Sequence, residues 1–271
     1  MSKLVLSKVQ VIYDAGTANE VCALRGIDLL IEDRDFISVV GSNGCGKSTL
    51  LKVVAGIIQP TAGRVYIDRR NVTELESYLR CRSVAFVHQN PLDSCAMGMT
   101  VEENLTAVML KGRRASGRFA PSKEMRMKLV QQIEELGIPL TNKLTSVVKD
   151  LSGGQKQVLA LTMAVLQQPD ILLLDEHTAS LDPANRLMVN QLTTKLVSTR
   201  QLTTVMVSHQ IEDALVTGNR ILVMNHGTIA LNADETQKRE LTKQDVEQWI
   251  IGANKSVSEN SAEEQWNGQS P

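Results

Sequence analysis

The chain has 271 residues, 42% of them apolar, and a formal net charge of −1. This length and composition predict a soluble globular protein with a sizeable core, in one large domain or two small ones. The near-neutral charge excludes a global attraction to nucleic acid or to anionic lipid. No apolar run approaches the ~20 residues of a membrane-spanning helix, and the first residues lack the apolar region of a signal peptide, so we expect any role at a membrane to need a membrane-spanning partner.

The first third of the chain predicts strands around a glycine-rich segment. Five segments rich in aliphatic and β-branched residues are expected to be strands: residues 4–13, 22–31, 36–40, 63–68 and 83–87. The third strand runs directly into GSNGCGKST, and a helix over 46–57 is expected to follow it and to end near Gly56. This order of strand, glycine-rich segment and helix is typical of α/β proteins.

The middle of the chain predicts helices. Thr100 and Glu103 have the spacing of a capping box, so a helix is expected over 101–111. A basic segment over 111–123 is expected to be a solvated loop, because its charges lack interleaved aromatic residues. Helices are then expected over 123–136 and 152–168. These elements predict a helical insertion at about 90–168.

The second half alternates strands and helices. Residues 171–174 and 203–207 are apolar runs without alternation, which is typical of parallel strands buried on both faces. Between them, Asp182 is expected to cap a helix whose first residue is Pro183. We therefore expect an α/β domain over 1–251. The segment 252–271 has almost no aliphatic residues and is expected to be a disordered tail.

The segment GSNGCGKS (41–48) fits the phosphate-binding pattern G-x-x-x-x-G-K-[ST]. Its glycines allow backbone N–H groups to turn toward phosphate oxygens, and the helix that follows directs its positive end at the same anion. Lys47 is expected to supply positive charge to the β- and γ-phosphates, and Ser48 a hydroxyl to Mg²⁺. A simple glycine turn is the weaker reading, because strand, loop and helix occur in the required order. The motif alone does not separate a kinase, a GTPase and an ATPase.

Two acids follow the apolar run ILLL. Asp175 ends this run, where a residue that orients Mg²⁺ is expected. Glu176 is the next residue, and we expect it to point elsewhere and to act as the general base for the attacking water, because successive strand side chains point in opposite directions. The same argument predicts that His177 forms no metal triad with them. His177 is expected to shape the loop that leads to Asp182.

The segment LSGGQ (151–155) is unusual for a helix start. Ser152 and Gln155 have capping-box spacing, but two glycines directly after a cap disfavour a helix. The glycines are explained if a ligand approaches the backbone closely. Because the loop at 41–49 already serves one nucleotide, LSGGQ is expected to serve a nucleotide held by a second protomer.

Together these motifs resemble those of the ATP-binding cassette (ABC) family over about residues 3–232. GSNGCGKST is similar to its Walker A loop, ILLLDE to Walker B and LSGGQ to its signature. ASLD (179–182) resembles the D-loop, although the family usually has Ser-Ala-Leu-Asp, so signalling between the two sites is expected to differ slightly.

Three further residues resemble functional residues of the family. Gln89 in FVHQN resembles the Q-loop glutamine, which touches Mg²⁺ and senses the transmembrane partner. His209 in VMVSH resembles the switch histidine that contacts the γ-phosphate. Tyr13 resembles the A-loop aromatic that stacks on adenine, although a lone tyrosine on a strand is more often a packing residue.

The resemblance implies roles for the following residues. Catalysis is assigned to Lys47, Glu176 and His209, and Mg²⁺ to Ser48, Gln89 and Asp175. Contacts to ATP are assigned to Tyr13, Gly41, Ser42, Asn43, Gly44, Cys45, Gly46, Lys47, Ser48, Thr49, Gln89, Ser152, Gly153, Gly154, Gln155 and Asp182.

The resemblance also implies a fold and a function. The fold is a P-loop NTPase with a RecA-like parallel-sheet core, an antiparallel β subdomain and a helical signature subdomain. Two such subunits, here a homodimer, clamp two ATP head to tail and reopen on hydrolysis. The expected function is to power solute transport, in particular import of a small solute such as an amino acid, through separate permease subunits, with a solute-binding protein as a further partner and no nucleic acid. The alternatives are a soluble ABC ATPase acting on DNA or ribosomes, and the ATPase of an exporter.

Some features depart from the family or refine its assignment. DEHTASLDP is similar to a group of bacterial import ATPases linked to amino-acid-like solutes, whereas the family often has Pro or Ala at His177. EDRD (32–35) stands where a glycine often makes the turn, and we expect an Asp to accommodate that turn. Cys45 lies within the phosphate loop, where it is either a small residue that fits or a site of oxidation. The expected location is cytoplasmic and peripheral, on the inner face of the cell membrane.

Overall fold

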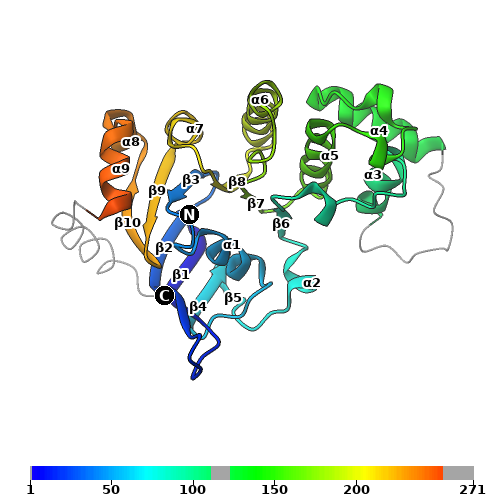
Figure 1. Ribbon diagram of the computed structural model, residues 1–271. Helices are drawn as coiled ribbons and strands as arrows, with labels where there is room; N and C mark the ends of the chain where they lie inside the picture. Colours follow the sequence, from blue (N-terminus) through cyan, green and yellow to red (C-terminus); the bar gives the residue numbers. More distant parts are fainter. Residues whose placement is uncertain (1, 111–122, 253–271) are drawn as a thin grey trace. The chain divides into compact units, whose positions relative to one another are not determined.

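The computed structural model describes residues 2–110 and 123–252 (Figure 1). The chain divides into two units, one formed by residues 2–77 with 205–252 and the other by residues 78–204. Almost all of the predicted basic loop and of the predicted tail lie outside the described residues. In the described part of the chain, no helix is long and apolar enough to cross a membrane.

The first unit contains an antiparallel sheet of four strands. Its order is β2-β1-β4-β5, formed by β2 (Val21–Glu32), β1 (Ser2–Tyr13), β4 (Ala62–Ile67) and β5 (Arg70–Asn71). Side chains of β2 alternate between buried and exposed along much of the strand, as expected for a sheet with one solvated face. This sheet is the antiparallel β subdomain that the sequence predicts.

The same unit also contains parallel strands. β3 (Phe36–Gly41) pairs in parallel with β9 (Arg220–Asn225), which pairs antiparallel with β10 (Thr228–Ala233). Helices of this unit pack on β9 through a small apolar core that includes Ala214, Ile221, Val223 and Val246. The helices of this core are α7 (Ile211–Val216) and α9 (Lys243–Ile251), and α8 (Glu235–Glu240) lies with them beside β9 and β10 in Figure 1.

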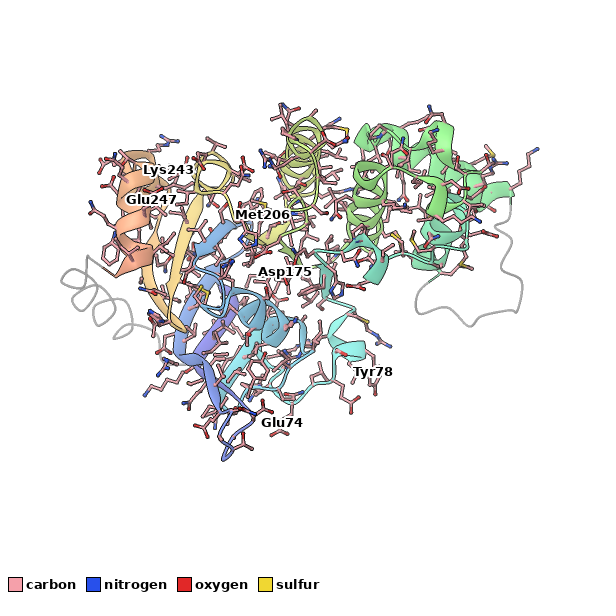
Figure 2. The ribbon with its side chains drawn as sticks, in the orientation of Figure 1. Glu74, Tyr78, Asp175, Met206, Lys243 and Glu247 are labelled. Atoms are coloured by element: carbon pink, nitrogen blue, oxygen red, sulfur yellow. The ribbon has the colours of Figure 1, made fainter. Side chains whose placement is uncertain are left out.

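An ion pair tethers α9 to α7. Lys243 Nζ lies 2.6 Å from Glu212 Oε1 on α7 and 3.8 Å from Glu247 Oε1, one turn further along α9 (Figure 2).

α1 (Lys47–Ala55) follows β3 and ends at Gly56, whose φ of 72° is the left-handed conformation of a helix C-cap. The predicted end of this helix near Gly56 is therefore confirmed.

The second unit pairs a short parallel sheet with helices. β6 (Val84–Val87) lies parallel to β7 (Ile171–Asp175), and all five residues of β7 are buried, as expected for a strand covered on both faces. Its helices are α2 (Ser77–Arg80), α3 (Val101–Met109), α4 (Lys123–Leu136), α5 (Gly153–Leu166) and α6 (Pro183–Arg200). α3, α4 and α5 form one helical group in Figure 1. β8 (Thr203–Val207) contains the boundary between the two units.

The turn before β3 differs from the expectation in one respect. The residue with a left-handed backbone is Arg34, with φ of 69°, and neither Asp33 nor Asp35 adopts a positive φ. Asp35 instead closes the turn, because its Oδ2 accepts a hydrogen bond of 2.9 Å from the backbone N–H of Glu32. The expectation that an Asp accommodates the turn conformation was therefore wrong, since the carboxylate acts through hydrogen bonds.

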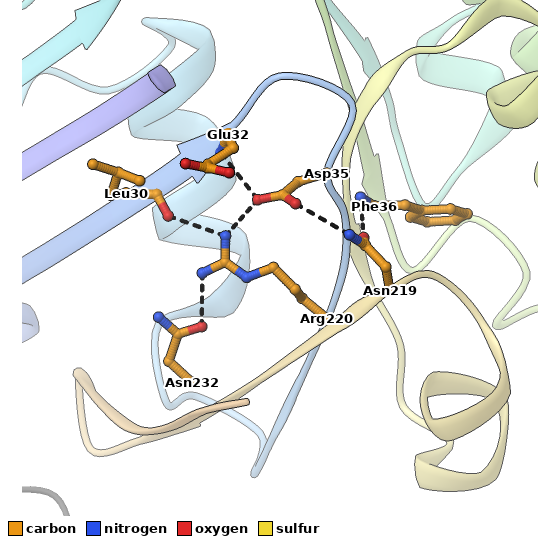
Figure 3. Close-up of polar contacts among 7 residues, drawn as sticks. All are labelled: Leu30, Glu32, Asp35, Phe36, Asn219, Arg220 and Asn232. Carbon is orange, nitrogen blue, oxygen red and sulfur yellow. Dashed lines mark hydrogen bonds and ion pairs between the residues drawn. The ribbon is translucent and has the colours of Figure 1, made fainter. Parts of the chain in front are cut away.

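Asp35 also anchors this turn to β9 and β10 (Figure 3). Its carboxylate pairs with the guanidinium of Arg220 and accepts a hydrogen bond of 3.2 Å from Asn219 Nδ2. Arg220 in turn donates to the carbonyl of Leu30 at 3.2 Å and to Asn232 Oδ1 at 2.9 Å. The network fixes the start of β3, the strand that leads into the glycine-rich loop.

Candidate nucleotide-binding site

The loop between β3 and α1 folds around the ammonium group of Lys47. Lys47 Nζ donates hydrogen bonds of 2.9 Å to the carbonyl oxygens of Gly41 and Ser42, and lies 3.9 Å from Cys45 Sγ. The side chain is 5% exposed. The loop therefore holds a full positive charge against neutral dipoles, and an anion is a stronger partner for that charge than a carbonyl oxygen.

Two glycines of this loop are required for different reasons. Gly46 precedes α1 with φ of 106°, and a Cβ atom there would lie 2.5 Å from the carbonyl oxygen of Ala23, so no side chain fits. Gly44 has φ of 75°, but a Cβ atom there would meet nothing within 4 Å. No side chain caps α1, so the N-terminus of this helix offers backbone N–H groups to an anion.

A hairpin turn supports the loop from the side. Gly227, in the turn between β9 and β10, donates its N–H to the carbonyl of Cys45 at 3.0 Å and accepts a hydrogen bond of 2.8 Å from the N–H of Arg25. This contact was not predicted from the sequence. The signal was present, because Asn225-His226-Gly227 between two apolar runs is typical of a tight hairpin turn.

Tyr13 lies beside the start of α1. Its hydroxyl is 3.2 Å from Thr49 Oγ1, and the side chain is 38% exposed. The last residue of β1 is thus brought to the Walker A segment by a direct contact. Stacking of its ring on adenine stays a prediction.

His209 follows β8 and is exposed. The residue before it, Ser208, donates its backbone N–H to the carbonyl of Val39 at 3.0 Å, and its hydroxyl donates to the carbonyl of Gln210 at the same distance. Val39 lies on β3, so the backbone at His209 is fixed to the strand that leads into the phosphate loop.

Asp175 and Glu176 differ in backbone as well as in position. Asp175 is the last residue of β7 (Figure 2) and is 8% exposed, whereas Glu176 is half-buried and has a left-handed backbone with φ of 48°. The carbonyl of Glu176 accepts a hydrogen bond of 2.9 Å from the N–H of Ala179, which closes a turn. Glu176 lies beyond the end of β7, so strand alternation does not apply to it, and the prediction that the two carboxylates point in different directions stays a prediction.

His177 points onto helix α6. Its Nε2 lies 3.1 Å from Thr193 Oγ1, and the residue is 2% exposed. Burial lowers the pKa of His177 to about 4, so the ring is neutral near pH 7. Among the described residues, no group of three His, Cys, Asp or Glu side chains is arranged to hold a metal ion.

The signature segment begins α5 with the predicted capping box. Ser152 Oγ accepts from the N–H of Gln155 at 3.3 Å, and the N–H of Ser152 donates to Gln155 Oε1 at 3.0 Å. The two glycines between them differ. Gly154 is buried, and a Cβ atom there would lie 2.7 Å from Asn185 Oδ1, whereas Gly153 is exposed and a Cβ atom would meet only Leu181, at 3.7 Å.

Asp182 caps α6 as predicted. Its Oδ1 accepts hydrogen bonds of 3.1 Å from the N–H groups of Ala184 and Asn185, and its Oδ2 accepts one of 2.6 Å from Asn185 Nδ2. These bonds, the one from the Asn185 side chain foremost, lower the pKa of Asp182. Asn185 therefore contacts both the D-loop aspartate and Gly154.

The three residues predicted to hold Mg²⁺ lie in both units. Gln89 is exposed and stands two residues after the end of β6, in the same unit as Asp175. Ser48 lies in the other unit, in the first turn of α1. All three offer oxygen donors, which are the ligands that Mg²⁺ prefers.

Comparison with known proteins decides the family. A family model described as "ABC transporter" matches residues 24–179. The chain belongs to the ABC transporter family. The ABC fold that the sequence predicted is thereby confirmed.

Individual relatives agree with this membership. The ABC chain is 38% identical over 234 residues to a "Tyrosine transport ATP-binding protein" of Clostridioides difficile, across 85% of this chain and 91% of that protein. It is 34% identical over 214 residues to a "Trehalose/maltose import ATP-binding protein" of Thermococcus litoralis, across 78% of this chain. It spans only 55% of that second relative's length.

Solved structures of ABC cassettes match the chain closely. A dimeric ATP-binding cassette in a post-hydrolysis state, bound to ADP and Pi, gives a TM-score of 0.72 at 28% identity, covering 86% of this chain and 98% of that one. An ABC cassette in its ADP conformation gives a TM-score of 0.76 at 23% identity, covering 93% and 99%, and shows the shared fold. As a member of this family, the chain binds ATP and is an ATPase.

Proposed function

We propose that the chain is the ATP-hydrolysing subunit of an importer and powers uptake of a small solute through separate permease subunits. The solute class we favour is amino acids, because the relative from Clostridioides difficile, matched over most of both chains, is named for tyrosine transport. Two copies of the chain would clamp two ATP head to tail, on the inner face of the cell membrane, with a solute-binding protein as a further partner.

One observation carries the nucleotide site. Lys47 is buried in the phosphate loop, where its ammonium donates to the carbonyl oxygens of Gly41 and Ser42 and lies 3.9 Å from Cys45 Sγ. We assign this ammonium to the β- and γ-phosphates, the backbone N–H groups of the loop to the phosphate oxygens, and Tyr13 to the adenine ring. The carbonyl contacts keep the charged group in place before a nucleotide binds.

The remaining roles follow the positions of the side chains. We assign Mg²⁺ to Ser48, Gln89 and Asp175. Mg²⁺ would neutralise charge on the phosphates when bound. Glu176 takes the proton of the attacking water, and His209 contacts the γ-phosphate. Gly153 offers its exposed backbone to the γ-phosphate bound by the second protomer. Ser152 and Gln155 also contact that phosphate.

The catalytic assignment is tested with Glu176→Gln. The amide has the shape of the carboxylate but cannot accept the proton, so ATP binding is expected to persist while turnover falls by about 10²–10⁴-fold. ATP-dependent dimerisation of this variant, followed by size-exclusion chromatography, is expected to become stable. Normal hydrolysis by Glu176→Gln would refute the role of Glu176 as base.

The transport assignment needs the whole complex. The chain is used to capture its membrane partner from cell extract, and the complex is reconstituted in proteoliposomes with the solute-binding protein that it recruits. ATP-dependent uptake of labelled tyrosine, and of other amino acids in parallel, is expected. The importer assignment is overturned if none of these amino acids is taken up. It is also overturned if the chain co-purifies with ribosomes or DNA in place of a membrane protein.

A further inference from the structure

His177 occupies an unusual place for an imidazole. It follows Glu176 directly and is 2% exposed, and its ring contacts Thr193 on α6. A buried polar ring persists only where its hydrogen bonds are made, because an unmade buried bond is costly. The partner of this ring therefore indicates what the residue is for.

The direction of the bond to that partner follows from hydrogen-bond accounting. Thr193 Oγ1 donates its one proton to the carbonyl of Val189 at 2.8 Å, one turn earlier on α6. We place the hydroxyl proton on the bond to Val189, so that the same oxygen accepts from His177 Nε2, 3.1 Å away. This assigns the proton of the neutral ring to Nε2 and makes His177 the donor.

The bond ties a strained turn to a rigid element. Glu176 has φ of 48°, a conformation that L-residues with a Cβ atom rarely adopt and that persists only where the surroundings hold it. The turn is closed on one side by the N–H of Ala179, and Asp182 fixes the far end of the loop at the cap of α6. The His177–Thr193 bond is a second attachment to α6, about 15 Å further along its axis.

We propose that His177 is a positioning residue, which holds the left-handed turn at Glu176 against α6 through Thr193 and so fixes the direction of the Glu176 carboxylate. This inference rests on the role proposed above for Glu176 as the base. The family resemblance does not supply it, because Pro or Ala is what that resemblance leads us to expect at this position, and a pyrrolidine or methyl group cannot make such a bond.

Thr193→Val is the variant that tests the bond. It removes the acceptor but keeps the branched shape, whereas His177→Ala would also leave a cavity. The expected result is a kcat for ATP lower by roughly tenfold to a hundredfold, because a small misplacement of a reacting group has an effect of that size. KM for ATP is expected to change less than about twofold. Thr193→Ser keeps the hydroxyl and is expected to restore kcat.

Thr162→Val is the matched control. Thr162 is also fully buried on a helix of the same unit. Its hydroxyl also donates to the carbonyl one turn earlier, that of Val158 at 2.7 Å, in a bond that involves no histidine. Its kcat is expected to stay within about twofold of the wild type. An equal loss of kcat in Thr162→Val and Thr193→Val overturns the proposal, because any lost buried hydroxyl would then have the same effect.

A second readout is independent of activity. In ¹⁵N-detected spectra of the imidazole, His177 is expected to show a neutral ring protonated at Nε2, with a slowly exchanging proton that exchanges faster in Thr193→Val. A ring protonated at Nδ1 would overturn the assignment. Unchanged kcat in Thr193→Val overturns the positioning role when Glu176→Gln is inactive. Normal ATP turnover by Glu176→Gln would instead refute the proposal that Glu176 is the base.

Discussion

Gly154 of the signature segment lies against Asn185 of α6, so close that a Cβ atom at position 154 would be 2.7 Å from Asn185 Oδ1. The same asparagine donates to Asp182, the cap of α6. One side chain thus connects the signature segment with the end of the D-loop inside a single chain. A residue at position 154 larger than glycine must displace it.

This contact predicts opposite effects for neighbouring substitutions. Gly→Ala in a helix normally stabilises by up to about 1 kcal/mol, and Gly153→Ala is expected to be neutral or mildly stabilising because its Cβ has space. Gly154→Ala is expected to lower the free energy of unfolding by about 1–3 kcal/mol through overpacking against Asn185. Urea unfolding of both variants measures this. Equal stabilities would contradict the contact.

Lys47→Ala is expected to weaken ATP binding. Removing the ammonium deletes a charge-assisted contact of about 1.5–3 kcal/mol, which corresponds to a Kd roughly tenfold to a hundredfold higher. A fluorescent ATP analogue reports the change. Lys52→Ala, in the last turn of the same helix, is the control and should leave the Kd nearly unchanged.

The ring and the hydroxyl of Tyr13 are expected to contribute differently to the affinity for ATP. Its hydroxyl contacts Thr49, so Tyr13→Phe loses that contact but keeps the aromatic face. If the ring stacks on adenine, Tyr13→Ala should raise the Kd for ATP by about tenfold, because base–aromatic stacking contributes about 1–3 kcal/mol. Tyr13→Phe should change it by less than about threefold. Similar losses in both variants would assign the effect to the hydroxyl.

Lys238 predicts a pH dependence of stability. Burial lowers its pKa to about 8, and its Nζ donates to the carbonyls of Thr217 and Gly218 at 2.5 and 2.9 Å. Because the unfolded chain retains this proton up to a pKa of about 10.4, the unfolded state binds more protons between pH 8 and 10. Stability attributable to Lys238 should therefore rise with pH in this window.

The measurement compares wild type with Lys238→Met. Unfolding free energies at pH 7.5 and 9.5 are subtracted, so that other groups that titrate at alkaline pH cancel. The wild type is expected to gain about 2 kcal/mol relative to the variant over this range. A difference that is flat or falls with pH would contradict a lowered pKa.

The helix caps and the phosphate loop were predictable because they depend on residues that are close together in the sequence. The capping boxes at Thr100 and Ser152 and the cap at Asp182 each need only residues within a few positions, and all three are present as predicted. The phosphate loop was predictable for the same reason, since its strand, glycines, Lys47 and helix are contiguous in the chain.

Features that depend on distant residues were not predictable. The glycine at 154 was attributed to an approaching ligand, which stays a prediction, and the tight contact with Asn185, 31 positions away, is a second reason for a glycine there. The turn at EDRD was attributed to the backbone of an Asp. Its actual basis was not predictable, because the partner of Asp35 is Arg220, which lies on another strand. Hydrophobic periodicity carries no information about such long-range polar pairs.

The hydrogen bonds of the phosphate loop have a consequence for ligand selection. Four carbonyl oxygens of the loop each accept a hydrogen bond from another group of the chain: those of Gly41, Ser42, Cys45 and Gly46. A metal cation that approached one of these four oxygens would have to share it with an N–H group or with the ammonium of Lys47. The loop thus favours anions over cations through its main chain together with Lys47, whichever nucleotide base or solute the rest of the protein selects.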